Sequence, residues 1–217
     1  MKRLALLGVL VPAVLLAKSD QPGAALVAAD EAFAKMARNQ GEWTAFRSFA
    51  GPRSEMFAPR RVLVSEFGKG LPDPKVATRW RPEQAWISCD ATVGVTFGRW
   101  SLPGSKMHGW YETVWAKMRD GSYKMLLRHA WDAPRQLLAK PGRKGARGAC
   151  TGKPGLPIVA PDVGTDFKFG ASYDQTLIWS SAVSAQSEVR IVVSLWDGTR
   201  HVPVLVDPAP NPPLTLR

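Results

Sequence analysis

The chain has 217 residues, of which 45% are hydrophobic and 22% charged, and its formal net charge is +11. This length allows one mid-sized domain, or one compact domain with an appendage, and the composition excludes wholesale disorder. Two cysteines and three histidines are too few for a disulfide-dense scaffold or a cysteine-rich zinc site. Seven of the nine tryptophans fall between Trp43 and Trp131, which indicates a core or a pocket walled by large aromatic side chains.

The N-terminal segment has the pattern of a secretion signal. Lys2 and Arg3 precede an uncharged run from Leu4 to Ala17, which is shorter than the roughly 18 to 20 apolar residues needed to span a bilayer. We therefore predict a signal peptide at residues 1–17, no membrane span, and a periplasmic or secreted mature protein. An uncleaved anchor or a buried first helix is the alternative. Because an exported protein rarely meets nucleic acid, we expect no nucleic-acid partner, and the positive charge serves either an anionic partner or solubility.

Helical patterns come before strand patterns in the larger part of the chain. Residues 22–39 carry Leu26, Phe33 and Met36 at helical spacing, and residues 43–50 suggest a second, short helix. This order predicts an α+β fold in which N-terminal helices pack on an antiparallel sheet. The strand patterns lie at residues 56–67, 84–90, 92–100, 108–118 and 123–131.

The sequence Arg119-Asp120-Gly121-Ser122 separates the last two strand patterns and is a strong hairpin signal. With a two-residue turn at Asp120 and Gly121, Glu112 opposes His129 and one face of the hairpin is almost wholly apolar, as a buried sheet face requires. A three-residue turn would instead place Glu112 against Arg128 and mix polar with apolar side chains on both faces. We favour the two-residue turn.

Three segments within residues 24–133 carry a family resemblance: AADEAFAKMARNQGEWTAFRSFA, EMFAPRRVLV and GWYETVWAKMRDGSYKMLLRHAWD. They are similar to the first helices, the first strand and the final hairpin of the nuclear-transport-factor-2-like superfamily, and within it to the SnoaL-like group and an allied uncharacterised domain family. The resemblance implies a cone of curved antiparallel sheet wrapped on helices with a pocket between them, and a homodimer as one state of the chain. The fold hosts isomerases, dehydratases, cyclases and non-catalytic binders, so it assigns no activity.

A basic linker rich in glycine and proline divides the chain. Its repeated prolines and glycines exclude a long helix or a central strand over residues 139–161. We assign residues 20–138 to the α+β domain and residues 162–217 to a small β-rich extension. The extension is too short to bury a stable core alone and should dock on the larger domain. No internal repeat is evident along the chain.

Glu112 and His129 are the candidate catalytic residues. A carboxylate and an imidazole opposed on an aromatic face could act as general base and orienter, or they could form a buried structural pair. His108 would add a third ligand-type group, but the spacing matches no metal motif, so we predict no metal and no cofactor. Asp90 and Asp132 lie near predicted strand ends, and Asp90 is expected to shape a turn.

Four aromatic residues are candidate ligand-binding residues. Trp86, Trp110, Tyr111 and Trp131 could line a pocket for a small apolar or amphipathic molecule, or they could fill a core. The leading prediction is an exported pocket protein that binds such a molecule without catalysis. The alternative is a metal-independent isomerase, dehydratase or cyclase that uses acid–base chemistry.

Cys89 and Cys150 are a candidate disulfide. Export places the chain in an oxidising compartment, where a pair of thiols tends to close. Cys89 lies at a predicted strand end and Cys150 in the linker, so a bond would pin the linker across the larger domain. The alternative is a buried Cys89 and a solvent-facing Cys150 thiol.

Overall fold

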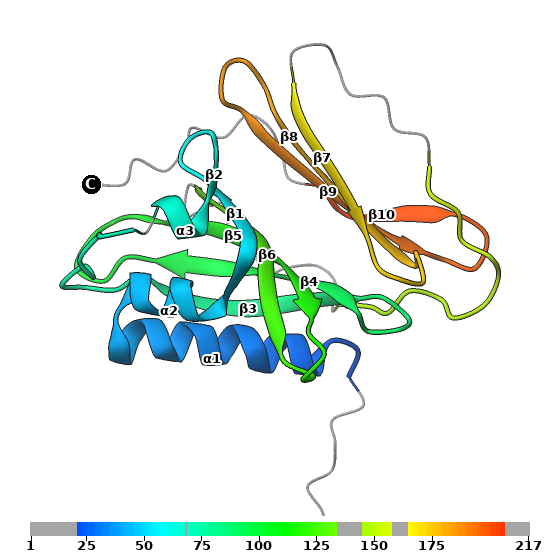
Figure 1. Ribbon diagram of the computed structural model, residues 1–217, viewed down its shortest axis with the longest axis horizontal. Helices are drawn as coiled ribbons and strands as arrows, with labels where there is room; N and C mark the ends of the chain where they lie inside the picture. The colour runs from blue at the N-terminus through cyan, green and yellow to red at the C-terminus, as the bar shows by residue number, and fades with distance from the viewer. Residues whose placement is uncertain (1–20, 68, 134–144, 158–164, 207–217) are drawn as a thin grey trace, which may run out of the picture.

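The computed structural model describes residues 21–67, 69–133, 145–157 and 165–206 (Figure 1). The predicted signal peptide at residues 1–17 lies outside the described residues, as do residues 134–144 and 158–164 in and around the linker. The helices are α1 (Ala24–Gln40), α2 (Glu42–Phe49) and α3 (Val64–Phe67).

The strands form two sheets. The main sheet is six-stranded and consists, in spatial order, of β2 (Arg61–Leu63), β1 (Ala50–Phe57), β6 (Tyr123–Asp132), β5 (His108–Lys117), β4 (Val93–Ser101) and β3 (Arg79–Ile87). The C-terminal sheet is four-stranded and consists of β10 (His201–Val206), β9 (Val189–Trp196), β8 (Leu177–Val183) and β7 (Asp166–Ala171). The chain is therefore α+β, as the order of the sequence patterns predicts.

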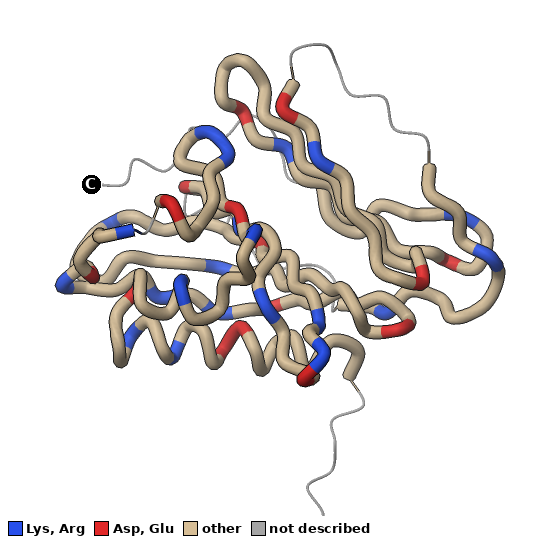
Figure 2. Tube along the Cα trace, in the orientation of Figure 1, with Lys and Arg blue, Asp and Glu red and all other residues tan. Residues whose placement is uncertain are grey.

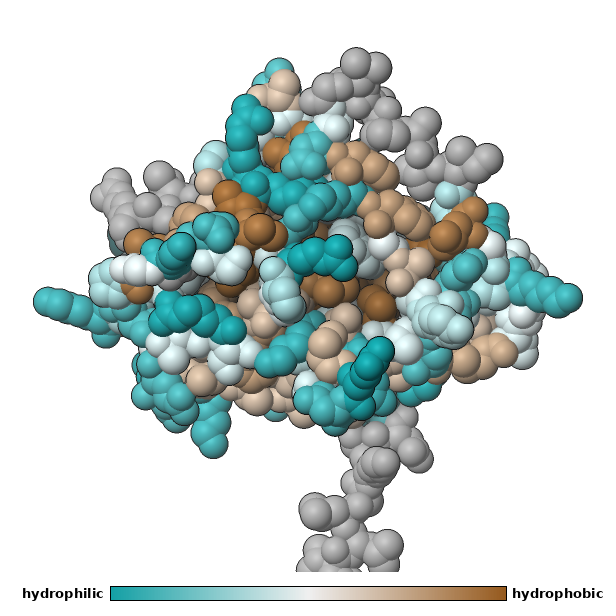
Figure 3. Space-filling view, viewed as in Figure 1, coloured by the Kyte–Doolittle hydropathy of each residue, from teal (hydrophilic) through white to brown (hydrophobic). Residues whose placement is uncertain are grey.

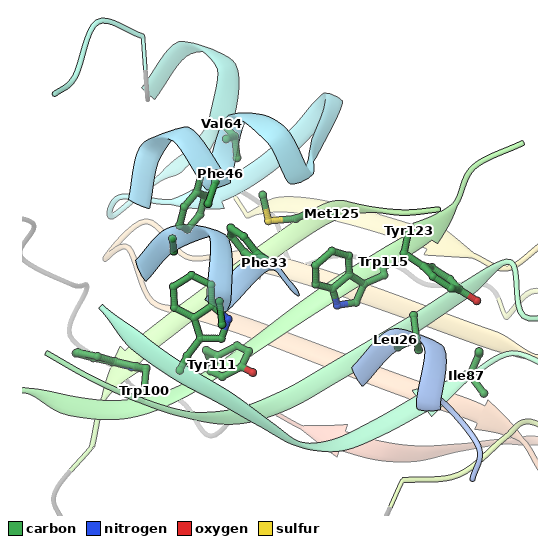
Figure 4. Close-up of a cluster of buried hydrophobic side chains, with 14 residues drawn as sticks. Leu26, Phe33, Phe46, Val64, Ile87, Trp100, Tyr111, Trp115, Tyr123 and Met125 are labelled. Carbon is green, nitrogen blue, oxygen red and sulfur yellow. The ribbon is translucent and has the colours of Figure 1, made fainter. Parts of the chain in front are cut away.

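Helix α1 covers one face of the main sheet because its buried residues recur every three or four positions. Leu26, Phe33 and Ala37 belong to this stripe and pack on the strands together with Phe46 of α2. Figure 4 shows Leu26, Phe33 and Phe46 pointing between the helices and the sheet. The helix ends at Gly41, whose φ of 113° is open to glycine but strained for other residues. The helical prediction for residues 22–39 is confirmed to within two residues.

The C-terminal sheet packs on the opposite face of the main sheet. Val95, Val114 and Leu127 of the main sheet share one buried cluster with Ile191 and Val193 of β9. Both faces of the main sheet are thus covered, by helices on one side and by a second sheet on the other (Figure 1). This packing is the docking that the small size of the extension predicts.

Three sequence predictions about the main sheet are wrong in detail. Residues 56–67 do not form one strand but divide into the end of β1, β2 and α3. The strand predicted at 84–90 begins earlier, at Arg79, because Pro82 is accommodated next to a bulge between Pro82 and Gln84. The sheet is not wholly antiparallel, because β1 pairs with β6 in parallel and so extends the sheet beyond the β5–β6 hairpin.

The β5–β6 hairpin corrects the predicted turn. Its loop has three residues, because Met118 N–H donates to the Ser122 carbonyl at 2.7 Å and Lys117 opposes Tyr123. Gly121 occupies the left-handed position of this loop at φ 84°. A bulge follows on β6, where the register shifts between the pairs Val114–Leu127 and Trp115–Met125.

The bulge decides which face each hairpin residue occupies. Beyond it, Glu112 opposes His129, so this predicted pair is present even though the predicted turn is absent. Met125 packs among the helices, whereas Leu127 faces the C-terminal sheet. The single apolar face predicted for the hairpin is therefore divided between the two sides of the sheet.

The linker contributes an edge pairing that the sequence did not predict. Ile87 donates to the Ala146 carbonyl at 3.0 Å and accepts from Gly148 N–H at 2.9 Å, which forms a parallel bridge on the outer edge of β3. Cys150 follows directly and forms a disulfide with Cys89, with their Cα atoms 5.2 Å apart. The linker is thereby pinned across the larger domain at this point.

The structure also shows a short repeat that inspection of the sequence missed. The turn between β3 and β4 (residues 88–92) and the turn between β7 and β8 (residues 172–176) both read Ser-x-Asp-x-Thr. In each turn the serine hydroxyl donates to the aspartate carboxylate at 2.6 Å. The residue after each aspartate, Ala91 or Gln175, has the same positive φ of 58°. Two five-residue motifs that lie 84 positions apart are too short a pattern to stand out in sequence.

Candidate functional site

Glu112 and His129 form a hydrogen-bonded pair on the face of the main sheet that is turned toward the C-terminal sheet. His129 Nδ1 lies 3.1 Å from Glu112 Oε1. Glu112 is fully buried and His129 is 5% exposed, and the imidazole stacks on Trp131 and meets the edge of Phe57. A general base has to be reached by its substrate. The geometry favours the structural interpretation of this pair.

The four predicted ligand-binding aromatics do not share one wall. Trp86, Trp110 and Trp131 lie on the same face as Glu112 and are linked through Phe97, whose ring centroid is 5.0 Å from that of Trp110 and 6.2 Å from that of Trp131. Trp86 is 6.4 Å from the same ring. Tyr111 is on the opposite face, toward the helices. The first three therefore gather around Phe97, and the fourth belongs to a different cluster.

Tyr111 contacts two buried charged residues, Asp30 and Arg128, which the sequence analysis did not predict as site residues. Asp30 is fully buried on α1, and its carboxylate accepts hydrogen bonds from Tyr111 Oη at 3.0 Å, Thr96 Oγ1 at 2.7 Å and Trp80 Nε1 at 2.9 Å. A guanidinium nitrogen of Arg128 lies 3.9 Å from the same carboxylate. The sequence signal was present, because Asp30 interrupts the apolar stripe between Leu26 and Phe33.

Aromatic rings surround the guanidinium of Arg128. It lies 4.3 Å from the ring centroid of Tyr111 and 4.6 Å from that of Trp80, and it donates to Thr113 Oγ1 at 2.6 Å. Burial lowers the pKa of Arg128, and the nearby Asp30 carboxylate acts in the opposite direction. Burial, together with the negative charge of Asp30, raises the pKa of Tyr111 well above its usual value.

This network occupies the space in which the family resemblance implies a pocket. Phe33, Trp115 and Met125 fill the remainder between α1, α2 and the strands (Figure 4). Asp30 and Arg128 neutralise one another and are both buried, so this space is closed to a ligand. Any binding site has to lie elsewhere on the described surface.

A hollow of about 760 Å³ opens beside the first residues of β3 and the β4–β5 hairpin. Figure 2 shows several basic positions at this end of the main sheet. The hollow therefore joins cationic side chains to apolar surface. Its lining consists of Arg79, Trp80, Arg81, Arg99, Trp100, Ser101, Ser105, Lys106, Met107 and His108.

Strand register explains why the cations gather there. Arg81 and Arg99 are directly opposed on β3 and β4, an arrangement of like charges that is normally unfavourable. The bulge at Glu83 inserts a carboxylate between them: its Oε1 accepts from Arg81 at 2.9 Å and from Arg99 Nε at 2.6 Å. Glu83 offsets one of these two charges. Arg79 and Lys106 are exposed and have no carboxylate at ion-pair distance within the described part of the chain.

Other candidate chemistry is limited. No group of three or more histidine, cysteine, aspartate or glutamate side chains is placed to hold a metal ion among the described residues. Asp90 shapes the β3–β4 turn, as expected. Burial raises the pKa of Asp132, and His108 acts to lower it. A smaller hollow of about 370 Å³ beside α2 carries one arginine, Arg47. None of the helices in the described ranges is both long enough and apolar enough to cross a bilayer.

Comparisons with known proteins leave the family open. No family model matches the chain, and no curated protein matches it. A search of solved structures finds a crystal structure from Parabacteroides distasonis ATCC 8503 named a "putative ketosteroid isomerase", which is similar over 49% of this chain and 87% of that chain, at 14% sequence identity and a TM-score of 0.40. A likeness at this level carries no argument about function. The arrangement of helices on a large curved sheet is consistent with a nuclear-transport-factor-2-like fold, and the finer SnoaL-like assignment stays a prediction.

Proposed function

We propose that the protein binds a small amphipathic anion in the hollow at the end of β3 and β4. The observation that carries this proposal is the lining of the hollow, which combines Arg79, Arg81, Arg99 and Lys106 with Trp80 and Trp100. Small-molecule sites are concave, largely apolar and oriented by a few polar groups. Arginine side chains bind carboxylate and phosphate oxygens through paired hydrogen bonds. The ligand class follows from these two properties together.

The charge balance supports an anion in preference to a neutral molecule. The described lining contains no carboxylate, and Glu83, which contacts Arg81 and Arg99 of the lining, offsets only one of the arginines. Because Arg79 and Lys106 are exposed, their attraction for an anion is screened by salt over about 10 Å at 0.1 M ionic strength. Binding should therefore be sensitive to ionic strength.

Binding without acid–base chemistry is the interpretation that the buried groups support. The Glu112–His129 pair and the Asp30–Arg128 network are both covered, and neither lines the hollow. The proposed ligand is a small amphipathic molecule, as the sequence predicts, but its proposed site is the basic hollow and not the four predicted aromatic residues.

An exported location is part of the same proposal. A disulfide such as that between Cys89 and Cys150 persists in an oxidising compartment and is rare in the cytosol.

A hydrophobic surface patch is a weaker candidate for a binding site on the face shown in Figure 3. Hydrophobic residues there form small areas separated by hydrophilic ones.

Three ligands with the same alkyl chain and different head-group charges distinguish recognition of the charge from recognition of the apolar chain. Titration calorimetry of the mature protein with dodecanoate, dodecanol and dodecyltrimethylammonium, each below its micelle concentration, should give binding in that order. We expect dodecanoate to bind roughly tenfold tighter than dodecanol, a difference of about 1.4 kcal/mol. Quenching of tryptophan fluorescence gives a second readout, since Trp80 and Trp100 line the hollow.

A matched pair of variants places the site. Exchange of both Arg79 and Lys106 for glutamate should weaken dodecanoate binding at least tenfold. Arg190→Glu, at an exposed position on β9 of the C-terminal sheet, changes charge without touching the hollow and should leave binding unchanged. Equal affinity for all three ligands, or equal loss in both variants, would refute the proposal.

A further inference from the structure

Two buried hydrogen-bond acceptors near the hollow have no partner within the described part of the chain, Glu83 Oε2 and His108 Nε2. His108 lines the hollow, whereas Glu83 lies outside the lining and contacts two of its arginines, Arg81 and Arg99. Buried polar atoms in native proteins almost always have partners, and an exception calls for an explanation. Because one atom is on the lining and the other is held by lining arginines, a group on the bound ligand accounts for both.

Only one of the two carboxylate oxygens of Glu83 has a hydrogen-bond partner among the described residues. Oε1 accepts from Arg81 and Arg99, while Oε2 accepts from no described residue. The side chain of Glu83 is 8% exposed, and that of its ion-pair partner Arg81 is 70% exposed. Because Arg81 is mostly exposed, its pair with Glu83 is weak and Arg81 can be displaced by a ligand at little cost.

His108 presents its second nitrogen as an acceptor as well. His108 Nδ1 lies 2.6 Å from the carbonyl oxygen of Lys106. A carbonyl oxygen can only accept, so Nδ1 carries the hydrogen of this bond. In the neutral imidazole Nε2 then has the free lone pair, and His108 lines the hollow.

We infer that the ligand of the hollow carries a hydrogen-bond donor, such as a hydroxyl group, beside its anionic group. The anionic group pairs with Arg79 and Lys106, and the donor satisfies Glu83 or His108. This inference rests on the proposed function and narrows its ligand class from amphipathic anions to hydroxylated ones. A site built to pair a ligand hydroxyl discriminates strongly against the analogue that lacks it, because its own polar groups are then left unpaired.

The test compares dodecanoate, 3-hydroxydodecanoate and 3-methoxydodecanoate by titration calorimetry. The methoxy compound keeps the oxygen and the bulk but cannot donate. We expect the hydroxy acid to bind at least tenfold tighter than dodecanoate, and the methoxy acid to show no gain. If dodecanoate binds and the hydroxyl group gives no advantage, the inference is wrong while the proposed function stands. If none of the three binds, the proposed function fails.

Variants of Glu83 and His108 identify which of the two accepts the hydrogen bond from the ligand's hydroxyl group. Glu83→Met combined with His108→Phe removes both acceptors. In this double variant the affinities for 3-hydroxydodecanoate and dodecanoate should differ by less than threefold. Each single variant is measured in the same way, so the test does not depend on folding of the double variant. Glu188→Met, in the β8–β9 turn, is the control and should keep the wild-type ratio. A ratio that survives in the folded Glu83→Met and His108→Phe proteins overturns the inference.

Discussion

Asp90 and Asp174 each accept a hydrogen bond from the other's backbone N–H. Asp90 N–H donates to Asp174 Oδ2 at 2.8 Å, and Asp174 N–H donates to Asp90 Oδ2 at 2.9 Å. The two Ser-x-Asp-x-Thr turns thus dock on one another with nearly the same contacts in both directions. Two adjacent carboxylates are tolerated here because N–H and O–H donors surround both.

The docked turns should contribute measurably to stability. Asp174→Ala leaves the N–H of Asp90 and the hydroxyl group of Thr176 without their acceptor, and Ser172 keeps only its longer bond to the Leu177 carbonyl at 3.3 Å. We expect a loss of about 2 kcal/mol in the free energy of unfolding, measured by urea denaturation. Asp120→Ala is the matched control, since Asp120 accepts the same local bonds from Ser122 in an exposed turn. Equal losses in the two variants would show that the contact between the sheets adds nothing.

The stability that Asp90 contributes should fall in acid. Burial alone would raise the pKa of Asp90, but hydrogen bonds from Ser88 and Thr92 outweigh it and hold the pKa below its usual value. A carboxyl group with a depressed folded pKa stabilises the fold above its unfolded pKa, about 3.9, and loses that contribution as pH falls through the folded pKa. The difference in unfolding free energy between wild type and Asp90→Asn should therefore be larger at neutral pH than at about pH 3. A constant difference across this range contradicts the argument.

The disulfide should stabilise the chain through its long loop. The sequence separation of Cys89 and Cys150 is 61 residues. On the chain-entropy account, closing such a loop stabilises by up to about 4 kcal/mol. The Cys89→Ser, Cys150→Ser protein should unfold at lower urea concentration than oxidised wild type, and dithiothreitol should destabilise only the wild type. Two titratable thiols in the unfolded, unreduced protein would rule the bond out.

The Asp30–Arg128 pair should behave as a coupled unit. Arg128→Met leaves a buried carboxylate without its cation, and Asp30→Asn leaves a buried guanidinium without its anion. Each single variant should lose about 3–5 kcal/mol, because an uncompensated buried charge remains. The double variant should lose clearly less than the sum of the two, as measured in a urea double-mutant cycle. Additive losses would show that the two charges act independently.

Local patterns in the sequence determined several features of this protein. Helical spacing located α1, strand patterns and the Asp120-Gly121 signal located the β5–β6 hairpin, and the size of the extension indicated that it docks. These features depend on residues close together in the chain, where periodicity and turn chemistry act directly. The pairing of Glu112 with His129 was predicted from a turn that does not form, and a bulge on β6 restores it.

The basic hollow and the docked turns were decided only by the tertiary structure. The bulge at Glu83 aims a carboxylate between two arginines, and the register of β3 against β4 brings those arginines together. Asp90 and Asp174 meet although 84 positions separate them. Contacts of this kind depend on strand register and on how the two sheets pack. Both are determined jointly by side chains that are distant in sequence. No short window of sequence contains that information.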